Sequence, residues 1–198
     1  LSGCKKFLNT LPDNRTELNT VDKVRSLLAT AYPQAAYQKI AEIMSDNAQD
    51  KGPASDTKVM DQTYFSFGDF ISDAGTQDGT VMYWSAAYAA VAAANAALDA
   101  IEKTPNPNDY SAEKGEALMC RAYAHFMLTT LFAKPYDETQ SKSDPGIPYV
   151  TKPETVVFGK YSRGTVQEDY DHIELDIVNG LPLINDDIYK VPKYHFTK

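Results

Sequence analysis

Two long segments of the chain have the periodicity of helices, and only a short turn separates them. The first, residues 80–103, is rich in alanine, a strong helix former that also lets a neighbouring helix approach closely. Its larger side chains form one continuous stripe at helical spacing: Trp84, Tyr88, Val91, Asn95 and Leu98. The second is residues 111–133, and the TPNPNDY segment between them can only turn the chain. The pattern predicts an antiparallel helical hairpin.

A shorter helix is expected before this hairpin. It should begin near Thr20, whose hydroxyl can cap free N–H groups, and its apolar face includes Val24, Leu28 and Ala31. Pro33 should kink or break it before a second piece continues through residues 40–43.

Another helix is expected after the hairpin. Thr165 and Glu168 have the spacing of a capping box, and apolar residues recur at helical spacing from Val166 to Ile177. Asn179-Gly180 should then stop this helix.

Two long segments, residues 45–79 and 134–164, lack a clear helical period. The chain is therefore predicted to be mainly α, with tetratricopeptide-like helical hairpins and long irregular loops. The spacing does not give a clean 34-residue repeat, because the 134–164 insertion interrupts it.

The charge and the apolar runs exclude some functions. A net charge of −8 argues against binding to nucleic acid and against electrostatic attraction to anionic lipid. The longest apolar stretch, Ala86 to Leu98, looks too short and too rich in alanine to span a bilayer.

Reactive and metal-binding patterns are weak. Cys120 lies in an apolar helical pattern and is expected to be buried, and no Cys/His spacing suggests zinc. The three histidines (His125, His172, His195) are far apart. Three acids (Asp69, Asp73, Asp78) miss the pattern of a calcium loop. No nucleophile elbow is present, and we expect no cofactor.

The 45–79 segment is the candidate ligand-binding region. It combines polar groups that can hydrogen-bond sugar hydroxyls with aromatic rings that can stack on sugar rings. The candidate residues are Asp46, Asn47, Asp50, Tyr64, Phe65 and Phe67. Lys51, Asp56, Asp61 and Phe70 lie among them. The alternative is that the aromatic residues fill the core and the acids form a solvated rim.

The chain begins with Leu1-Ser2-Gly3-Cys4, which has the form of a bacterial lipoprotein cleavage box. On this interpretation Cys4 carries lipid that ties the protein to a membrane, and residues 1–19 are a tether to the folded part. The alternative is an ordinary cysteine.

Several segments, in order, resemble conserved motifs of the SusD/RagB family of outer-membrane nutrient-binding lipoproteins. They are Cys4-Lys5-Lys6-Phe7-Leu8-Asn9 with Pro12; Tyr83-Trp84, Tyr88, Ala94-Asn95 and Leu98; Lys114-Gly115-Glu116-Ala117, Arg121-Ala122-Tyr123, Phe126 and Leu131-Phe132; Asp144-Pro145-Gly146-Ile147-Pro148-Tyr149-Val150; and Arg163 with Thr165-Val166-Gln167-Glu168, Tyr170-Asp171, Ile173 and Asp176. Each motif is weak alone, but their order covers nearly the whole chain.

The resemblance implies a non-catalytic, cell-surface lipoprotein of the outer membrane. Such a protein binds oligosaccharides, or in some cases peptides, and delivers them to a SusC-like TonB-dependent porin. Family members are more than twice this length, so residues 20–198 would be the N-terminal helical domain, with the C-terminal half missing. Trp84, Asn95 and Arg121 are interpreted as structural, with Arg121 paired either to Glu116 or to an acid in residues 165–180.

Two other functions are open from the residues. One is a tetratricopeptide-like adaptor that binds only protein. The other is a glycan hydrolase, which has no support beyond the supply of carboxylates.

Overall fold

A computed structural model of the chain describes residues 17–52, 59–68, 78–155, 159–188 and 195–198. The α-helices are α2 (Val21–Leu28), α3 (Gln38–Ile43), α4 (Val59–Phe65), α5 (Thr80–Glu102), α6 (Ser111–Phe132) and α7 (Val166–Gly180). Short 3₁₀ turns are η1 (Pro107–Tyr110), η2 (Gln140–Lys142), η3 (Leu181–Leu183) and η4 (Asp186–Ile188). The β-structure of the described residues is one isolated bridge, Pro145–Thr165. The prediction of a mainly α, tetratricopeptide-like fold is confirmed.

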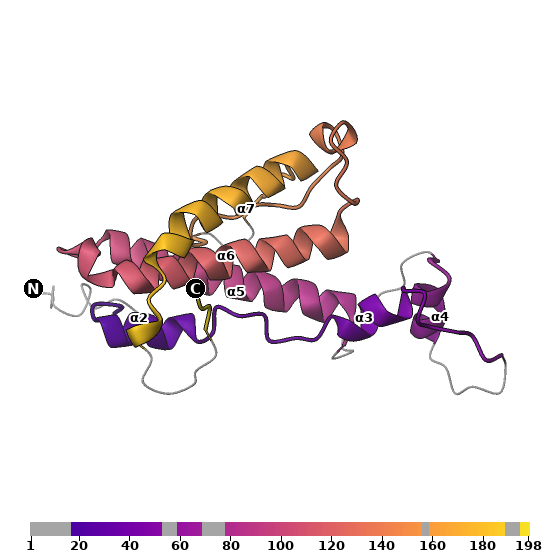
Figure 1. The fold of residues 1–198 in the computed structure, drawn as a ribbon, viewed down its shortest axis with the longest axis horizontal. Coiled ribbons are helices and arrows are strands. Elements are labelled where there is room, and N and C mark those ends of the chain that lie inside the picture. The colour runs from indigo at the N-terminus through magenta and orange to yellow at the C-terminus, as the bar shows by residue number, and fades with distance from the viewer. Residues whose placement is uncertain (1–16, 53–58, 69–77, 156–158, 189–194) are drawn as a thin grey trace, which may run out of the picture.

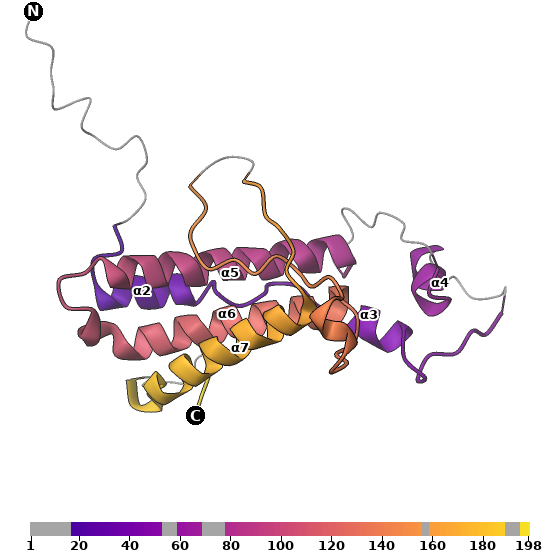
Figure 2. The ribbon, with the colours of Figure 1, turned by 90° about the horizontal axis from the view of Figure 1, so that it is seen from above.

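Helix α6 is at the centre of the fold. It packs against α5 on one side and α7 on the other, and α2 contacts both helices of the α5–α6 hairpin. Figure 1 shows α5 and α6 as long neighbours with α7 crossing above them, and α3 and α4 at the end of the hairpin away from α2. In Figure 2 the chain between α6 and α7 runs back over α5 before α7 begins.

The core reflects the sequence pattern. Val24 and Leu28 of α2 pack with the small residues of α5, where Ala94 and Ala97 are fully buried. Alanine at these positions lets the helices approach closely. Cys120 is buried in the same cluster, as predicted. Burial raises the pKa of its thiol, and the negative charge of the nearby Glu116 raises it further. The thiol therefore stays protonated at neutral pH.

Helix α5 has almost the predicted bounds, Thr80–Glu102 against an expected 80–103. Among the described residues it is the one helix with the length and composition to cross a membrane. Its most apolar stretch, residues 86–98, is only the middle part of the helix. Its contacts with α2 and α6 nevertheless indicate the core helix of a folded body.

The predicted helix starts are confirmed and some helix ends are not. The Thr20 side chain accepts from the Lys23 N–H, and Thr165 and Glu168 form both hydrogen bonds of the capping box. Helix α2 ends at Leu28, before Pro33 is reached. Helix α4 lies within a segment in which no helix was predicted.

Helix α7 ends at Gly180, as predicted, but not through a left-handed glycine cap. Gly180 keeps right-handed helical geometry, and the chain continues directly into η3. Its function is close packing, because a Cβ there would lie 2.9 Å from the Leu118 Cβ on α6. Gly115 on α6 is equally crowded, since its Cβ would lie 2.8 Å from the Leu183 Cβ. The two glycines let α6, α7 and η3 approach more closely than side chains would allow.

We predict that Gly180→Ala destabilises the protein by about 1–3 kcal/mol, because the added methyl group overpacks the contact with Leu118. The measurement is the free energy of unfolding in urea. Asn179→Ala, at the exposed neighbouring position of α7, is the control and should be neutral or slightly stabilising. Equal stability of the two variants would contradict the close-packing explanation.

Candidate functional site

A cavity of about 560 Å³ lies between α3, α4 and the chain that follows α3. Its wall is formed by Ile43, Ala48, Gln49, Asp50, Lys51, Asp61, Gln62, Phe65 and Ser66. Lys39 of α3 and Asp61 of α4 form an ion pair at 2.8 Å, which joins the two helices. The cavity therefore offers an aromatic ring beside carboxylate, ammonium and amide groups.

The structure brings two of the predicted ligand residues, Asp50 and Phe65, to the wall of this cavity. Asp46, Asn47, Tyr64 and Phe67 do not line it. Asp46 and Asn47 are exposed. Phe67 is 70% exposed and has a φ of 51°, a left-handed conformation that is uncommon for a bulky side chain.

The cavity also includes Lys51 and Asp61, which the sequence analysis had noted beside the candidates. Phe70 and Asp56 lie outside the described residues, as do Cys4 and the acids Asp69 and Asp73. In the described ranges, no group of three or more His, Cys, Asp or Glu is placed to hold a metal.

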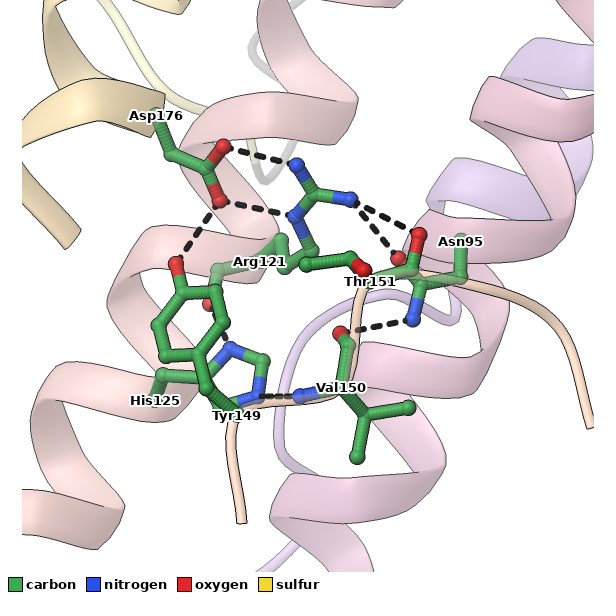
Figure 3. Close-up of polar contacts among 7 residues, drawn as sticks. All are labelled: Asn95, Arg121, His125, Tyr149, Val150, Thr151 and Asp176. Carbon is green, nitrogen blue, oxygen red and sulfur yellow. Dashed lines mark hydrogen bonds and ion pairs between the residues drawn. The ribbon is translucent and has the colours of Figure 1, made fainter. Parts of the chain in front are cut away.

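A buried ion pair joins α6 to α7 (Figure 3). The Arg121 Nε and Nη2 atoms each donate to a separate oxygen of Asp176, both at 2.7 Å. Arg121 Nη1 donates to the Asn95 side-chain oxygen of α5 at 2.9 Å and to the Thr151 carbonyl at 3.2 Å. Burial alone would lower the pKa of Arg121, but Asp176 more than compensates and raises it. Arg121 therefore stays charged.

The same network fixes the chain around Val150. The Asn95 amide donates to the Val150 carbonyl at 2.9 Å, and the Val150 N–H donates to His125 Nε2 at 3.1 Å. The Tyr149 hydroxyl donates to Asp176 at 2.8 Å, while its ring stacks on His125 at 3.8 Å. Figure 3 shows these groups converging from α5, α6, α7 and the connecting chain.

Asp169 of α7 forms a second anchor, nearer the start of that connecting chain. Its buried carboxylate accepts from the Ile147 N–H at 2.8 Å and from the Thr129 hydroxyl at 3.4 Å. Burial raises the pKa of Asp169, although both hydrogen bonds oppose that shift. Asp169 also packs where a Cβ on Gly146 would lie, so glycine is required there.

The structural interpretation of two residues is confirmed. Asn95 bonds to a backbone carbonyl, and Arg121 pairs with an acid of the 165–180 helix, namely Asp176. Glu116, the other acid considered, instead accepts from the Tyr32 hydroxyl at 2.8 Å. Arg121 and Asp176 bind each other and the groups around them, so the role of this network is to position residues 150–151.

Trp84 packs against the core, in line with its structural interpretation, but it lies at the edge of the core. Its ring contacts Phe132 with ring centroids 5.0 Å apart, and its side chain is only partly buried. Its stripe on α5 lines a second cavity of about 370 Å³. The residues of this cavity are Trp84, Ser85, Tyr88, Val91, Ala92, Pro148, Val150, Lys152, Glu154 and Tyr161. The sequence analysis missed Glu154 and Tyr161. The one signal available for this site was an aromatic residue, Tyr161, in a polar loop.

A third and larger cavity, of about 690 Å³, lies farther along α5. It shares Lys152 with the second cavity, and Arg121 forms part of its wall. Ligand-sized cavities of this kind usually span about 300–1,000 Å³, so all three have the size of a small-molecule site.

The fold and these cavities define a class of protein: a tetratricopeptide-like helical scaffold with ligand-sized cavities between its helices and its loops. The sequence matches the SusD-like family model, described as "Starch-binding associating with outer membrane", over residues 6–198. The chain belongs to this family.

Solved structures agree with this fold. A SusD superfamily protein from Bacteroides thetaiotaomicron matches with a TM-score of 0.64 and 22% identity, over 84% of this chain and 38% of that one. A protein from Bacteroides vulgatus described as a putative sugar binding protein matches with a TM-score of 0.65 and 24% identity, over 86% and 38%. One from Bacteroides fragilis matches with a TM-score of 0.65 and 19% identity, over 92% and 44%.

The chain thus spans less than half the length of these solved proteins. No curated protein matches it.

We predict that Asp176→Asn destabilises the protein by about 3–5 kcal/mol, because it leaves the buried Arg121 charge without its counter-ion. The measurement is the free energy of unfolding in urea at pH 7. Asp99→Asn is the matched control, since Asp99 pairs with Lys103 at 2.6 Å but the two side chains are 39% and 72% exposed. Breaking that pair should cost about 0.5 kcal/mol or less. Similar losses in both variants would contradict the proposed importance of burial.

We also predict that stability falls as the pH drops from about 6.5 to 4, and that His125 contributes to this loss. Burial lowers the pKa of His125 to about 4, and the Arg121 and His172 charges act in the same direction. Protonation would remove the acceptor of the Val150 N–H. Since the unfolded chain binds this proton first, neutral His125 stabilises the fold above pH 6.5 and loses that contribution below it.

The measurement is the unfolding free energy of the wild type and of His125→Gln across this pH range. The stability advantage of the wild type should shrink by about 3 kcal/mol at most. Asp169 lies in the same region and titrates in the opposite sense, so the difference between the two proteins, rather than either profile alone, isolates His125. A constant difference would contradict the prediction.

Proposed function

We propose that this chain is the helical N-terminal part of a surface lipoprotein of the outer membrane that binds nutrient glycans without catalysis. The observation that carries the proposal is the family match across residues 6–198, because that family is described as starch-binding and associated with the outer membrane. Cys4 would carry the lipid anchor, with residues 1–19 as the tether. Delivery of the bound glycan to a SusC-like TonB-dependent transporter completes the proposal.

The cavity between α3 and α4 is the proposed glycan site. Phe65 is 39% exposed at its wall and can stack on the apolar face of a sugar ring. Asp50, Asp61 and Lys51 supply acceptors and a donor for hydroxyl groups around that ring. Asp50 already accepts a hydrogen bond from the Gly52 N–H at 2.7 Å, which holds its carboxylate in place.

Transporter docking has separate support on α7. Leu175 and Val178 are 57% and 61% exposed on this helix, and Leu181 follows at 42%. Large apolar side chains that gather on a surface are typical of protein contact sites. The surface favours a protein partner in addition to the glycan, and an adaptor without a glycan ligand remains the alternative.

The test of glycan binding is affinity electrophoresis of this chain in gels that contain soluble starch, xylan or mannan, followed by titration calorimetry with an oligosaccharide of the polysaccharide that retards it. Phe65→Ala and Asp50→Asn should each weaken binding about threefold to tenfold, through loss of a stacking ring or of a charged acceptor. No new reducing ends should appear during incubation.

Matched controls are available for both variants. Phe126→Ala removes a phenylalanine of similar exposure, 41%, that lies outside this cavity. Asp46→Asn changes a neighbouring exposed acid that does not line it. Equal affinity in all four variants would remove the α3–α4 cavity from the proposal, and failure of every polysaccharide to retard the chain would remove glycan binding.

A further inference from the structure

The cavity beside Trp84 has the chemistry of a second ligand site, and it shares no lining residue with the α3–α4 cavity. It lies between α5 and the connecting chain that leads away from the buried network. Trp84, Tyr88 and Val91 form its α5 side at positions i, i+4 and i+7, so they share one face of the helix.

The opposite wall is formed by alternate residues of the chain that follows Ile147. Pro148, Val150, Lys152 and Glu154 line this cavity, whereas Thr151, Pro153 and Thr155 line the larger one. Residues of even and odd number thus line different cavities, and Lys152, where the chain bends, lines both. The chain between residues 148 and 155 is therefore a partition between two cavities along α5.

The aromatic surface of this cavity is fixed before any ligand arrives. Trp84 is held between Phe132 and Tyr88, each with a ring-centroid distance of 5.0 Å. The Tyr88 hydroxyl donates to the Pro148 carbonyl at 2.8 Å, which ties α5 to the opposite wall. Binding then costs little ordering of these side chains.

The polar groups at the rim suit a neutral ligand rich in hydroxyl groups. Lys152 can donate hydrogen bonds and Glu154 can accept them, and their charges balance. Tyr161 is 50% exposed beside them. Partial desolvation raises the pKa of the Tyr161 hydroxyl, and a hydrogen bond to Glu154 raises it further. Tyr161 and Glu154 therefore lie together at the rim.

A peptide that adds as a strand does not fit here. Such a peptide needs free backbone N–H and C=O groups on the edge it joins. At Val150 both groups are already bonded, to His125 and Asn95, and the Thr151 carbonyl accepts from Arg121. Recognition in this cavity must therefore use side chains.

We propose that this cavity is a second sugar subsite, in which one ring of a neutral oligosaccharide stacks on Trp84 and Tyr161 while Lys152 and Glu154 bind its hydroxyl groups. This inference rests on the proposed glycan-binding function, but it assigns residues that are separate from the α3–α4 cavity.

The test uses Trp84 itself, because it is the single tryptophan of the chain and its fluorescence reports directly on this cavity. Maltoheptaose, xylohexaose and mannohexaose are titrated into the chain while tryptophan emission is recorded. We expect a saturable change in emission with at least one of them. Tyr161→Ala should weaken the corresponding Kd about threefold to tenfold.

Three variants make the result specific. Tyr136→Ala removes a tyrosine of nearly equal exposure, 49%, that does not line the cavity, and should leave the titration unchanged. Phe65→Ala and Asp50→Asn alter the α3–α4 cavity and should leave the emission change intact.

Each other result overturns the inference. Glycan binding in gels without any emission change, or with equal affinity in Tyr161→Ala and the wild type, would show that the glycan binds elsewhere and would leave the proposed function standing. An emission change that Phe65→Ala abolishes would assign the signal to the α3–α4 cavity. Absence of glycan binding in both assays would remove the proposed function and this subsite together.

Discussion

The ion pair between Arg121 and Asp176 is the interaction on which the rest of the structure depends. Removing these charges from water is costly, and a buried pair offsets that cost only when its remaining hydrogen-bonding groups also find partners. Here Asn95, Tyr149 and the Thr151 carbonyl supply those partners. Three helices and one connecting segment must therefore come together before the charges are satisfied, so the pair selects one arrangement of the elements.

The network also determines what surface the protein presents. Val150 is bonded through both backbone groups, and Asp169 fixes Ile147 a few residues earlier. The segment from Pro148 onward is also hydrogen-bonded to α5 through Tyr88 and Asn95, and its residues line two cavities. Buried side chains thus hold this irregular segment in one conformation through hydrogen bonds to its backbone.

Much of this fold could be predicted from the sequence because its strongest signals are local. The α5–α6 hairpin and the cap at Thr165 follow from residues close together in the chain. Arg121 could be assigned an acidic partner from its apolar surroundings alone. Which acid it chose could not be known, because Asp176 is 55 residues away and Glu116 was equally suitable by composition.

Some residues have a signal that is compatible with two structures. A glycine after a helical pattern can cap the helix in a left-handed conformation or allow close packing; α7 does end at Gly180, but the glycine stays right-handed and is explained by its close contact with Leu118. An aromatic in an apolar stripe can fill the core or form the wall of a cavity, and Trp84 does both. Helix α4 was missed because it is short, with seven residues, and none of its side chains is fully buried.

The two proposed glycan sites differ in how firmly the fold holds them, and this difference bears on how each would bind. The ion pair Lys39–Asp61 joins α3 to α4. These are short helices at one end of the hairpin (Figure 1). The cavity at Trp84 instead rests on α5 and on chain anchored by the buried network. A ligand in the first site must compensate for more ordering than a ligand in the second. The Trp84 cavity is therefore the better place for a selective contact with one sugar ring, whereas the α3–α4 cavity can adjust to oligosaccharides of different shape.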